Sequence, residues 1–140
     1  MKEYNVIDLF AGVGGLSYGF SEMPEFHILA ANEIERDIAA AYSLNHPGVT
    51  MLNCDICALT ESALLEATGR QQIDIVIGGP PCQSSSTLGN RRLDEKASMF
   101  LQYKRILQLL KPRAFVFENV VGLLSMDHGR LFPQIQAEFR

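Results

Sequence analysis

The chain has 140 residues, a length that fits one domain and leaves little room for a second. Hydrophobic residues make up 47% and charged residues 20%, a composition typical of a globular protein and unlike that of a disordered chain. The net charge of −4 has the wrong sign for a freestanding nucleic-acid-binding protein, because phosphate contacts require clustered Lys and Arg.

Short apolar runs alternate along the first half of the chain with segments of helical periodicity. In chain order, the sequence predicts a strand at residues 4–10, a helix at 16–23, a strand at 26–31, a helix at 35–44, a strand at 50–53, a helix at 60–68 and a strand at 74–77. Thr60 is the expected N-cap of the third helix and Gly69 its C-terminal stop.

The second half begins with a segment that has neither period. Residues 82–97 are rich in serine and then basic, so we expect a long loop, and loops of that length are usually functional or disordered. The helix that follows ends at Pro112 and presents five apolar side chains on one face. These side chains are Phe100, Tyr103, Ile106, Leu107 and Leu110. A fifth strand is expected at residues 114–117 and a last helix at 131–139.

Five strands that alternate with helices predict an α/β fold. We expect a mostly parallel sheet with helices on both faces, wound like a Rossmann fold. In such sheets ligands bind beyond the carboxyl ends of the strands. The residues just after each strand are therefore the ones expected to carry function.

The first three strand ends have the residue types of a nucleotide site. Residues 10–15 form a glycine-rich turn that lets a ligand come close to the backbone, although a plain structural turn is the alternative. Glu33 follows about 20 residues later, where nucleotide-binding folds place the acid that accepts ribose hydroxyls. The alternative for Glu33 is a solvated loop acid. Asp55 can accept a hydrogen bond from an adenine amino group while Ile56 packs on the ring, or it can cap a turn.

The last two strand ends carry reactive side chains. Cys82 follows Pro80 and Pro81, and two prolines that fix the backbone suit a nucleophile better than a packing residue. Glu118 directly follows the fifth strand, which we expect to neighbour the fourth or nearly so, and a carboxyl group there can serve as a general acid if burial raises its pKa. Each half alone has a structural alternative, but together they favour an enzyme.

Cys54 and Cys57 form a lone C-x-x-C pair. Zinc needs two more ligands, and His46 is the only nearby histidine. A thioredoxin-type redox role has no other support in the chain. We therefore expect these cysteines to be structural and expect no metal site.

The motifs resemble those of the cytosine-C5 DNA methyltransferase family, in order and spacing, from Asp8 to about Phe132. Residues 8–15 are similar to the family's cofactor motif, residues 80–83 to its nucleophile motif and residues 118–120 to its acid motif. The resemblance implies a Rossmann-like fold that uses S-adenosylmethionine. It implies that the cofactor-binding residues are Phe10, Gly12, Val13, Gly14, Gly15, Glu33, Ile34, Asp55, Ile56, Pro81 and Met99.

The same resemblance implies the chemistry. The target cytosine is flipped out of the DNA duplex, and the Cys82 thiolate adds to its carbon 6. Glu118 hydrogen-bonds N3 and the exocyclic amine, so that carbon 5 can accept the methyl group. Gln83, Ser86 and Arg91 are the expected DNA contacts, with solvated loop residues as the alternative.

Two departures from the family pattern stand out. Residues 84–86 are three serines where the family usually has Gly-Phe-Ser, so an aromatic side chain is missing at Ser85. The family's target-recognition region and closing helix have no counterpart in residues 1–140. We therefore expect a cofactor-binding and catalytic domain, incomplete at its C-terminus, that works with a C-terminal segment or a second subunit. Such a partner would supply most DNA contacts.

Other functions compete with this one. A tRNA cytosine-C5 methyltransferase shares the nucleophile and acid motifs, and a non-catalytic cofactor-binding fragment fits the three serines. A nicotinamide dehydrogenase is disfavoured because the turn reads Gly-x-Gly-Gly rather than Gly-x-Gly-x-x-Gly.

Cysteine usage and hydropathy indicate the compartment. Three cysteines without a secretory signal favour free thiols in a reducing environment. The longest apolar runs are strand-sized and too short to span a membrane. We therefore expect a cytoplasmic protein without a membrane partner.

Overall fold

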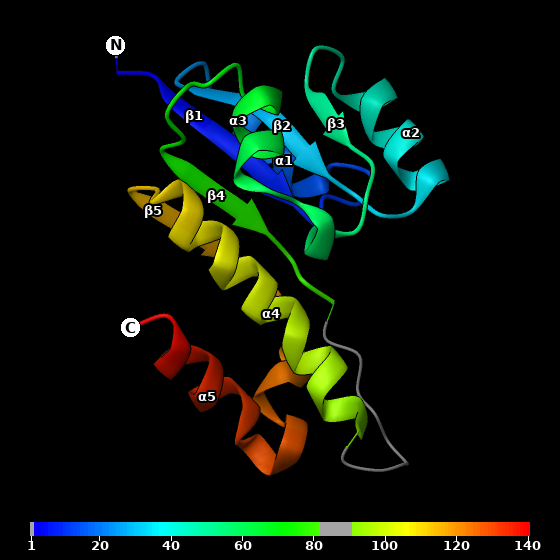
Figure 1. Ribbon diagram of the computed structural model, residues 1–140, viewed down its shortest axis with the longest axis vertical. Coiled ribbons are helices and arrows are strands. Elements are labelled where there is room, and N and C mark those ends of the chain that lie inside the picture. Colours follow the sequence, from blue (N-terminus) through cyan, green and yellow to red (C-terminus); the bar gives the residue numbers. More distant parts are fainter. Residues whose placement is uncertain (1, 82–90) are drawn as a thin grey trace.

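A computed structural model describes residues 2–81 and 91–140 of the chain, and for residues 91–98 it describes the backbone alone. Within these residues, parallel strands form a sheet in the order β3-β2-β1-β4-β5 (Figure 1). The strands are β1 (Tyr4–Leu9), β2 (Phe26–Asn32), β3 (Thr50–Leu52), β4 (Ile75–Gly78) and β5 (Ala114–Phe117). The expected α/β fold is confirmed, and so is the expected pairing of the fourth strand with the fifth.

Because each neighbouring pair is parallel, the carboxyl ends of all these strands lie at one edge of the sheet. The chain runs outward from β1 to β3 on one side and from β4 to β5 on the other. The order of the strands therefore reverses between β1 and β4. Ligands in open parallel sheets bind at such a point.

The helices begin and end close to the predicted positions, with one exception. They are α1 (Gly15–Ser21), α2 (Arg36–Asn45), α3 (Glu61–Ala67), α4 (Arg91–Leu110) and α5 (Leu131–Glu138), with short 3-10 turns η1 (Ile56–Ala58), η2 (Val121–Leu124) and η3 (Met126–Gly129). Thr60 caps α3 as predicted, because its hydroxyl oxygen accepts a hydrogen bond from the N–H of Ala63 at 3.2 Å.

The exception is the start of α4. Residues 91–97 were expected in the loop but are helical, so Arg91 begins a helix rather than belonging to the loop. These residues show no apolar period. They are nevertheless mostly strong helix formers, such as Arg, Leu, Glu, Lys and Ala, and intrinsic propensity can extend a helix beyond its packed part. The remaining residues of the predicted loop lie outside the described residues.

Helices cover both faces of the sheet. In β1, Ile7 and Leu9 point to one face, where they join a buried cluster with Leu64 of α3 and Tyr103 of α4. Asp8, between them, points to the opposite face. There it meets α1 and α2, which contribute Ser17 and Tyr42 to a second buried layer. Figure 1 shows α5 beside α4, away from β1 to β3.

No helix in the described part of the chain is both long and apolar enough to cross a membrane. The longest helix, α4, has 20 residues, but it carries charged side chains along its length.

A chain of hydrogen-bonded hydroxyls leads to the buried carboxyl group of Asp8. The Ser17 hydroxyl donates to Asp8 Oδ2 at 2.6 Å, and the Tyr42 hydroxyl lies 2.7 Å from the Ser17 oxygen. Because the one proton of Ser17 goes to Asp8, Tyr42 donates to Ser17. Asp8 is 1% exposed. Burial raises the pKa of Asp8 to about 7, against the hydrogen bonds from Ser17, which lower it; the charge of Glu33 adds to the rise.

We predict that Asp8 makes stability depend on pH. In the unfolded chain the pKa returns to 3.8, so the folded state binds this proton more tightly. The resulting stabilisation is complete below about pH 4 and is lost as the pH rises to about 7, by an amount on the order of 4 kcal/mol. Asp8→Asn keeps an acceptor for Ser17 but cannot titrate. Urea unfolding at pH 4 to 8 should therefore give a flatter curve for the variant, and parallel curves would contradict the assignment.

Candidate functional site

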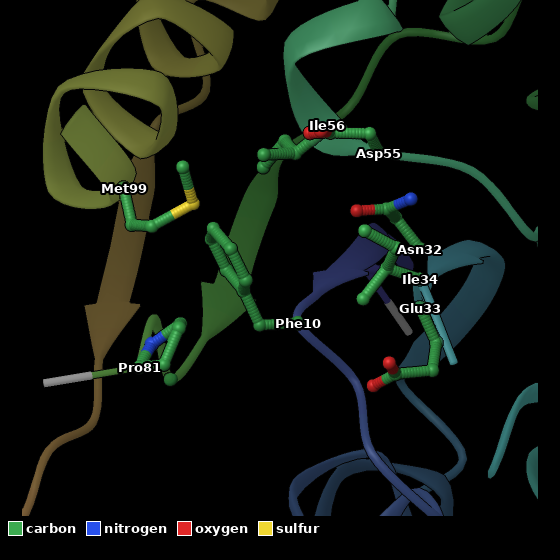
Figure 2. Close-up of a pocket in the computed structure, with 9 residues that line it drawn as sticks. Phe10, Asn32, Glu33, Ile34, Asp55, Ile56, Pro81 and Met99 are labelled. Atoms are coloured by element: carbon green, nitrogen blue, oxygen red, sulfur yellow. The ribbon is translucent and has the colours of Figure 1, made fainter. Parts of the chain in front are cut away.

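A cavity of about 290 Å³ opens at the carboxyl edge of the sheet. Its volume lies at the lower end of the range that is usual for ligand pockets. It is lined by the last residue of β2, by residues that follow β1, β2, β3 and β4, and by one residue of α4 (Figure 2). These residues are Phe10, Asn32, Glu33, Ile34, Asp55, Ile56, Gly79, Pro81 and Met99. The cavity therefore lies where the order of the strands reverses.

Most of the predicted cofactor-binding residues meet in this cavity. The seven that line it are Phe10, Glu33, Ile34, Asp55, Ile56, Pro81 and Met99. The other four, Gly12, Val13, Gly14 and Gly15, are not among its lining residues. They continue the turn that starts at Phe10, and Gly12 contacts the cavity residue Glu33 directly.

The ring of Phe10 projects into the cavity between Met99 on the left and Ile34 on the right, and Ile56 lies above it (Figure 2). The backbone of Phe10 has φ 55°, a left-handed conformation that residues other than glycine rarely adopt. The hydrogen bond from the N–H of Ala11 to the carbonyl of Asn32, at 2.9 Å, helps to hold this bend. The apolar walls form a slot suited to a flat, weakly polar group.

Glu33 supplies a buried carboxylate to this cavity. Its Oε2 accepts a hydrogen bond from the N–H of Gly12 and its Oε1 accepts one from the N–H of Glu35, each at 2.9 Å. The residue is 9% exposed, which does not fit a solvated loop acid. Each carboxylate oxygen can accept two hydrogen bonds, so acceptor capacity remains for hydroxyl groups of a ligand.

Asp55 caps a turn, which is one of the two roles considered from the sequence, and it also lies at the cavity. Its Oδ1 accepts a hydrogen bond from the N–H of Cys57 at 2.8 Å and so caps η1, while the residue also lines the cavity. Arg105 of α4 also contacts η1. Its guanidinium donates to the carbonyls of Ile56 and Leu59, both at 2.8 Å. The η1 wall of the cavity is thereby fixed to the helix that carries Met99.

The sequence analysis missed two polar residues at this edge. Asn32 is 2% exposed, and its amide donates to the carbonyls of Leu52 and Cys54, both at 2.8 Å. It therefore joins the ends of β2 and β3. Its position directly before Glu33, at the end of a buried strand, was the available signal.

The second residue, Asn119, belongs to the predicted acid motif but was given no role of its own, and it joins the ends of β4 and β5. Its amide donates to the carbonyl of Pro80 at 2.9 Å, and the N–H of Glu118 donates to the carbonyl of Gly78 at 2.9 Å. A Cβ atom on Gly79 would lie 2.5 Å from Glu118 Oε2, so the carboxylate lies against the segment that leads into Cys82. Glu118 itself is exposed.

Cys82, Gln83 and Ser86 lie outside the described residues, as do the side chain of Arg91 and the serines at 84–86. Two other thiols are described. Burial, then the charge of Asp55, raises the pKa of Cys54, and burial is also the largest cause that raises the pKa of Cys57. A raised pKa disfavours the reactive thiolate. Within residues 2–81 and 99–140, no group of three or more His, Cys, Asp and Glu residues could hold a metal ion.

Comparison with known proteins assigns this arrangement to a family. The C-5 cytosine-specific DNA methylase family matches residues 4–140. The chain belongs to this family. The resemblance noted in the three sequence motifs is therefore confirmed over nearly the whole chain.

Among relatives in the DNA methylase family are two bacterial type II methyltransferases. M.DdeI of Desulfomicrobium norvegicum is 43% identical over 125 residues, which are 87% of this chain and 29% of M.DdeI. M.XorII of Xanthomonas oryzae pv. oryzae is 39% identical over 137 residues, which are 96% of this chain and 32% of M.XorII. The chain thus spans about a third of the length of these relatives.

Solved structures of methyltransferases share the fold. A DNA modification methyltransferase encoded within an Escherichia coli prophage superposes with a TM-score of 0.81 at 29% identity, over 97% of this chain and 37% of that one. The Dnmt2 methyltransferase of S. pombe gives a TM-score of 0.70 at 22% identity, over 97% of this chain and 40% of that one, a likeness of fold alone.

Proposed function

We propose that the chain binds S-adenosylmethionine in the cavity and supplies Cys82 and Glu118 for methyl transfer to carbon 5 of cytosine in DNA. The observation that carries the proposal is the meeting of seven expected cofactor residues in one cavity, beside a strand end that places Glu118 against the segment before Cys82. We further propose that a C-terminal segment or a second subunit recognises the target sequence. The net charge of −4 supports this division, because DNA binding requires a basic surface.

The residues of the cavity fit the parts of the cofactor. Ile34 and Ile56 provide apolar walls for an adenine ring, with Asp55 as an acceptor for its amino group. The Glu33 carboxylate accepts hydrogen bonds from ribose hydroxyls. Phe10 and the glycine turn at residues 11–15 accommodate the amino-acid side, with Pro81 and Met99 closing the cavity. When bound, the cofactor supplies an electrophilic methyl group.

The cysteine and the acid act on the cytosine ring from neighbouring strand ends. The Cys82 thiolate adds to carbon 6 while Glu118 hydrogen-bonds N3 and the exocyclic amine, which stabilises the charge that develops in the ring. Carbon 5 would then bond to the methyl group as the bond between that methyl and the cofactor sulfur breaks, which would leave S-adenosylhomocysteine. Loss of the carbon-5 proton and cleavage of the sulfur–carbon bond release the product and the thiolate. Asn119, through its bond to Pro80, keeps the two strand ends together.

The duplex must release the target base before this reaction. Base flipping requires a few kcal/mol, which contacts with the flanking DNA must offset. We propose Gln83, Ser86 and Arg91 as contacts from this chain. Residues 1–140 alone should therefore transfer methyl groups poorly compared with a preparation that includes target recognition.

We predict that Glu33 binds the ribose. Glu33→Gln keeps an acceptor oxygen but loses the charge, and its loss of affinity for S-adenosylhomocysteine should be on the order of 1 to 3 kcal/mol. The matched measurement uses the analogue of S-adenosylhomocysteine that lacks both ribose hydroxyls. Wild type and variant should bind this analogue with the same affinity. Calorimetric titration gives both affinities. An equal loss for both ligands would show that Glu33 only supports the fold.

We predict that Cys82 forms the covalent adduct with cytosine. DNA that contains 5-fluorocytosine cannot lose its carbon-5 substituent as a proton, so the adduct should persist. With a preparation that includes target recognition, mass spectrometry should place the added mass on the peptide that contains Cys82. Cys82→Ser should lose the adduct, whereas Cys54→Ala and Cys57→Ala should keep it.

An adduct on Cys54 or Cys57 would overturn the assignment of the nucleophile. An adduct at Cys82 with 5-fluorocytosine in tRNA, but not in DNA, would contradict the DNA substrate while leaving the chemistry in place.

A further inference from the structure

The glycine turn is held from the side of α2 as well as by Glu33. The side-chain amide of Asn45, the last residue of α2, donates to the carbonyl of Val13 at 2.8 Å. The next residue, His46, brings its Nε2 to 2.9 Å from the carbonyl of Gly14. A carbonyl oxygen only accepts, so Nε2 carries the proton in this contact. Two successive peptide groups of the turn are thus bonded to the end of one helix.

His46 occupies the space that a side chain at residue 14 would need. A Cβ atom on Gly14 would overlap the imidazole ring, and the φ of Gly14 is 94°. His46 is 7% exposed, and its ring packs on the ring of Tyr42 with centroids 4.6 Å apart. Tyr42 in turn contacts Ser17 of α1, which places the start of α1 against the same helix. The absence of a side chain at Gly14 therefore serves close packing of α2.

These contacts also orient the remaining donors of the turn. In a trans peptide group the C=O and the N–H point in opposite directions. The carbonyl of Gly14 accepts from His46 and also from the N–H of Tyr18 in α1, at 2.8 Å, so the N–H of Gly15 points in the opposite direction, away from α2. On the other side of the turn, the N–H of Gly12 is bonded to Glu33, a cavity residue. The turn is therefore fixed between the carboxylate at the cavity and two side chains of α2.

We propose that Asn45 and His46 are positioning residues, which set the peptide groups of the glycine turn for the amino-acid end of the cofactor without touching the cofactor. The proposal rests on the proposed function, since it needs the amino-acid end to lie at this turn. It gives Glu33 and the end of α2, which both contact the turn, different roles in cofactor binding. Glu33 serves the ribose, and the end of α2 serves the amino-acid end.

Two ligands that differ only at that end test the proposal. S-Adenosylhomocysteine carries the amino-acid group, and 5′-methylthioadenosine has the same adenosine and sulfur but lacks it. Asn45→Ala and His46→Phe each remove one donor, and phenylalanine retains a ring to pack on Tyr42. Each variant should bind S-adenosylhomocysteine about two- to ten-fold more weakly than the wild type, which is the change in affinity that loss of one hydrogen bond produces. Both should bind 5′-methylthioadenosine as the wild type does.

Two further variants serve as controls. Leu44 is 84% exposed, so Leu44→Ala removes side-chain atoms from the same end of α2 without altering a contact with the turn, and both affinities should stay at the wild-type level. His46→Gln places an amide donor near the position of Nε2 and should recover part of the affinity that His46→Phe loses. Backbone amide NMR spectra of the 140-residue chain supply the affinities, and signals of Val13, Gly14 and Gly15 should move with S-adenosylhomocysteine alone.

An equal loss of affinity for both ligands would overturn the proposal, because it would show a general structural role. Unchanged affinity for S-adenosylhomocysteine in both variants would overturn it as well. If the wild-type chain bound neither ligand, the proposed cofactor site itself would fail. If it bound both with no shift at residues 13–15, only the placement of the amino-acid end would fail.

Discussion

The Glu33 carboxylate accepts one hydrogen bond from the N–H of Gly12 and another from the N–H of Glu35, and it thereby joins the residues that follow β1 to those that follow β2. A buried charge is tolerated only where hydrogen bonds satisfy it, and these two backbone donors meet that requirement. The shape of the cavity depends on this constraint. It holds the glycine turn beside Phe10, whose strained backbone turns its ring into the cavity.

The strand ends on the two sides of the sheet contribute different parts of the proposed site. The ends of β1, β2 and β3 supply most of the cavity in which we propose that the cofactor binds, while the ends of β4 and β5 bring Glu118 to the segment before Cys82. Long-range side-chain contacts hold the two parts in place. Arg105 fixes η1 to α4, and Asn119 fixes the end of β5 to Pro80. A few polar contacts thus hold the proposed cofactor cavity and the proposed catalytic pair at one edge of the sheet.

Much of this arrangement could be predicted from the sequence, because strands, glycine turns and strand ends leave local patterns. Glu33 and Ile56 were found in this way. Asn32, Arg105 and Asn119 were not, since each acts on the backbone of a segment distant in the chain. No local period reports such a contact. The start of α4 was misplaced for a related reason, because helix propensity without an apolar face resembles a basic loop.

The central claim is that the cavity at the strand ends binds the cofactor, and a crystal structure of the chain with saturating S-adenosylhomocysteine tests it most directly. The account predicts ligand density in the cavity, with the adenine between Ile34 and Ile56 and a ribose hydroxyl in hydrogen-bonding distance of Glu33. Ligand bound elsewhere, or an unoccupied cavity at saturating concentration, would contradict the account.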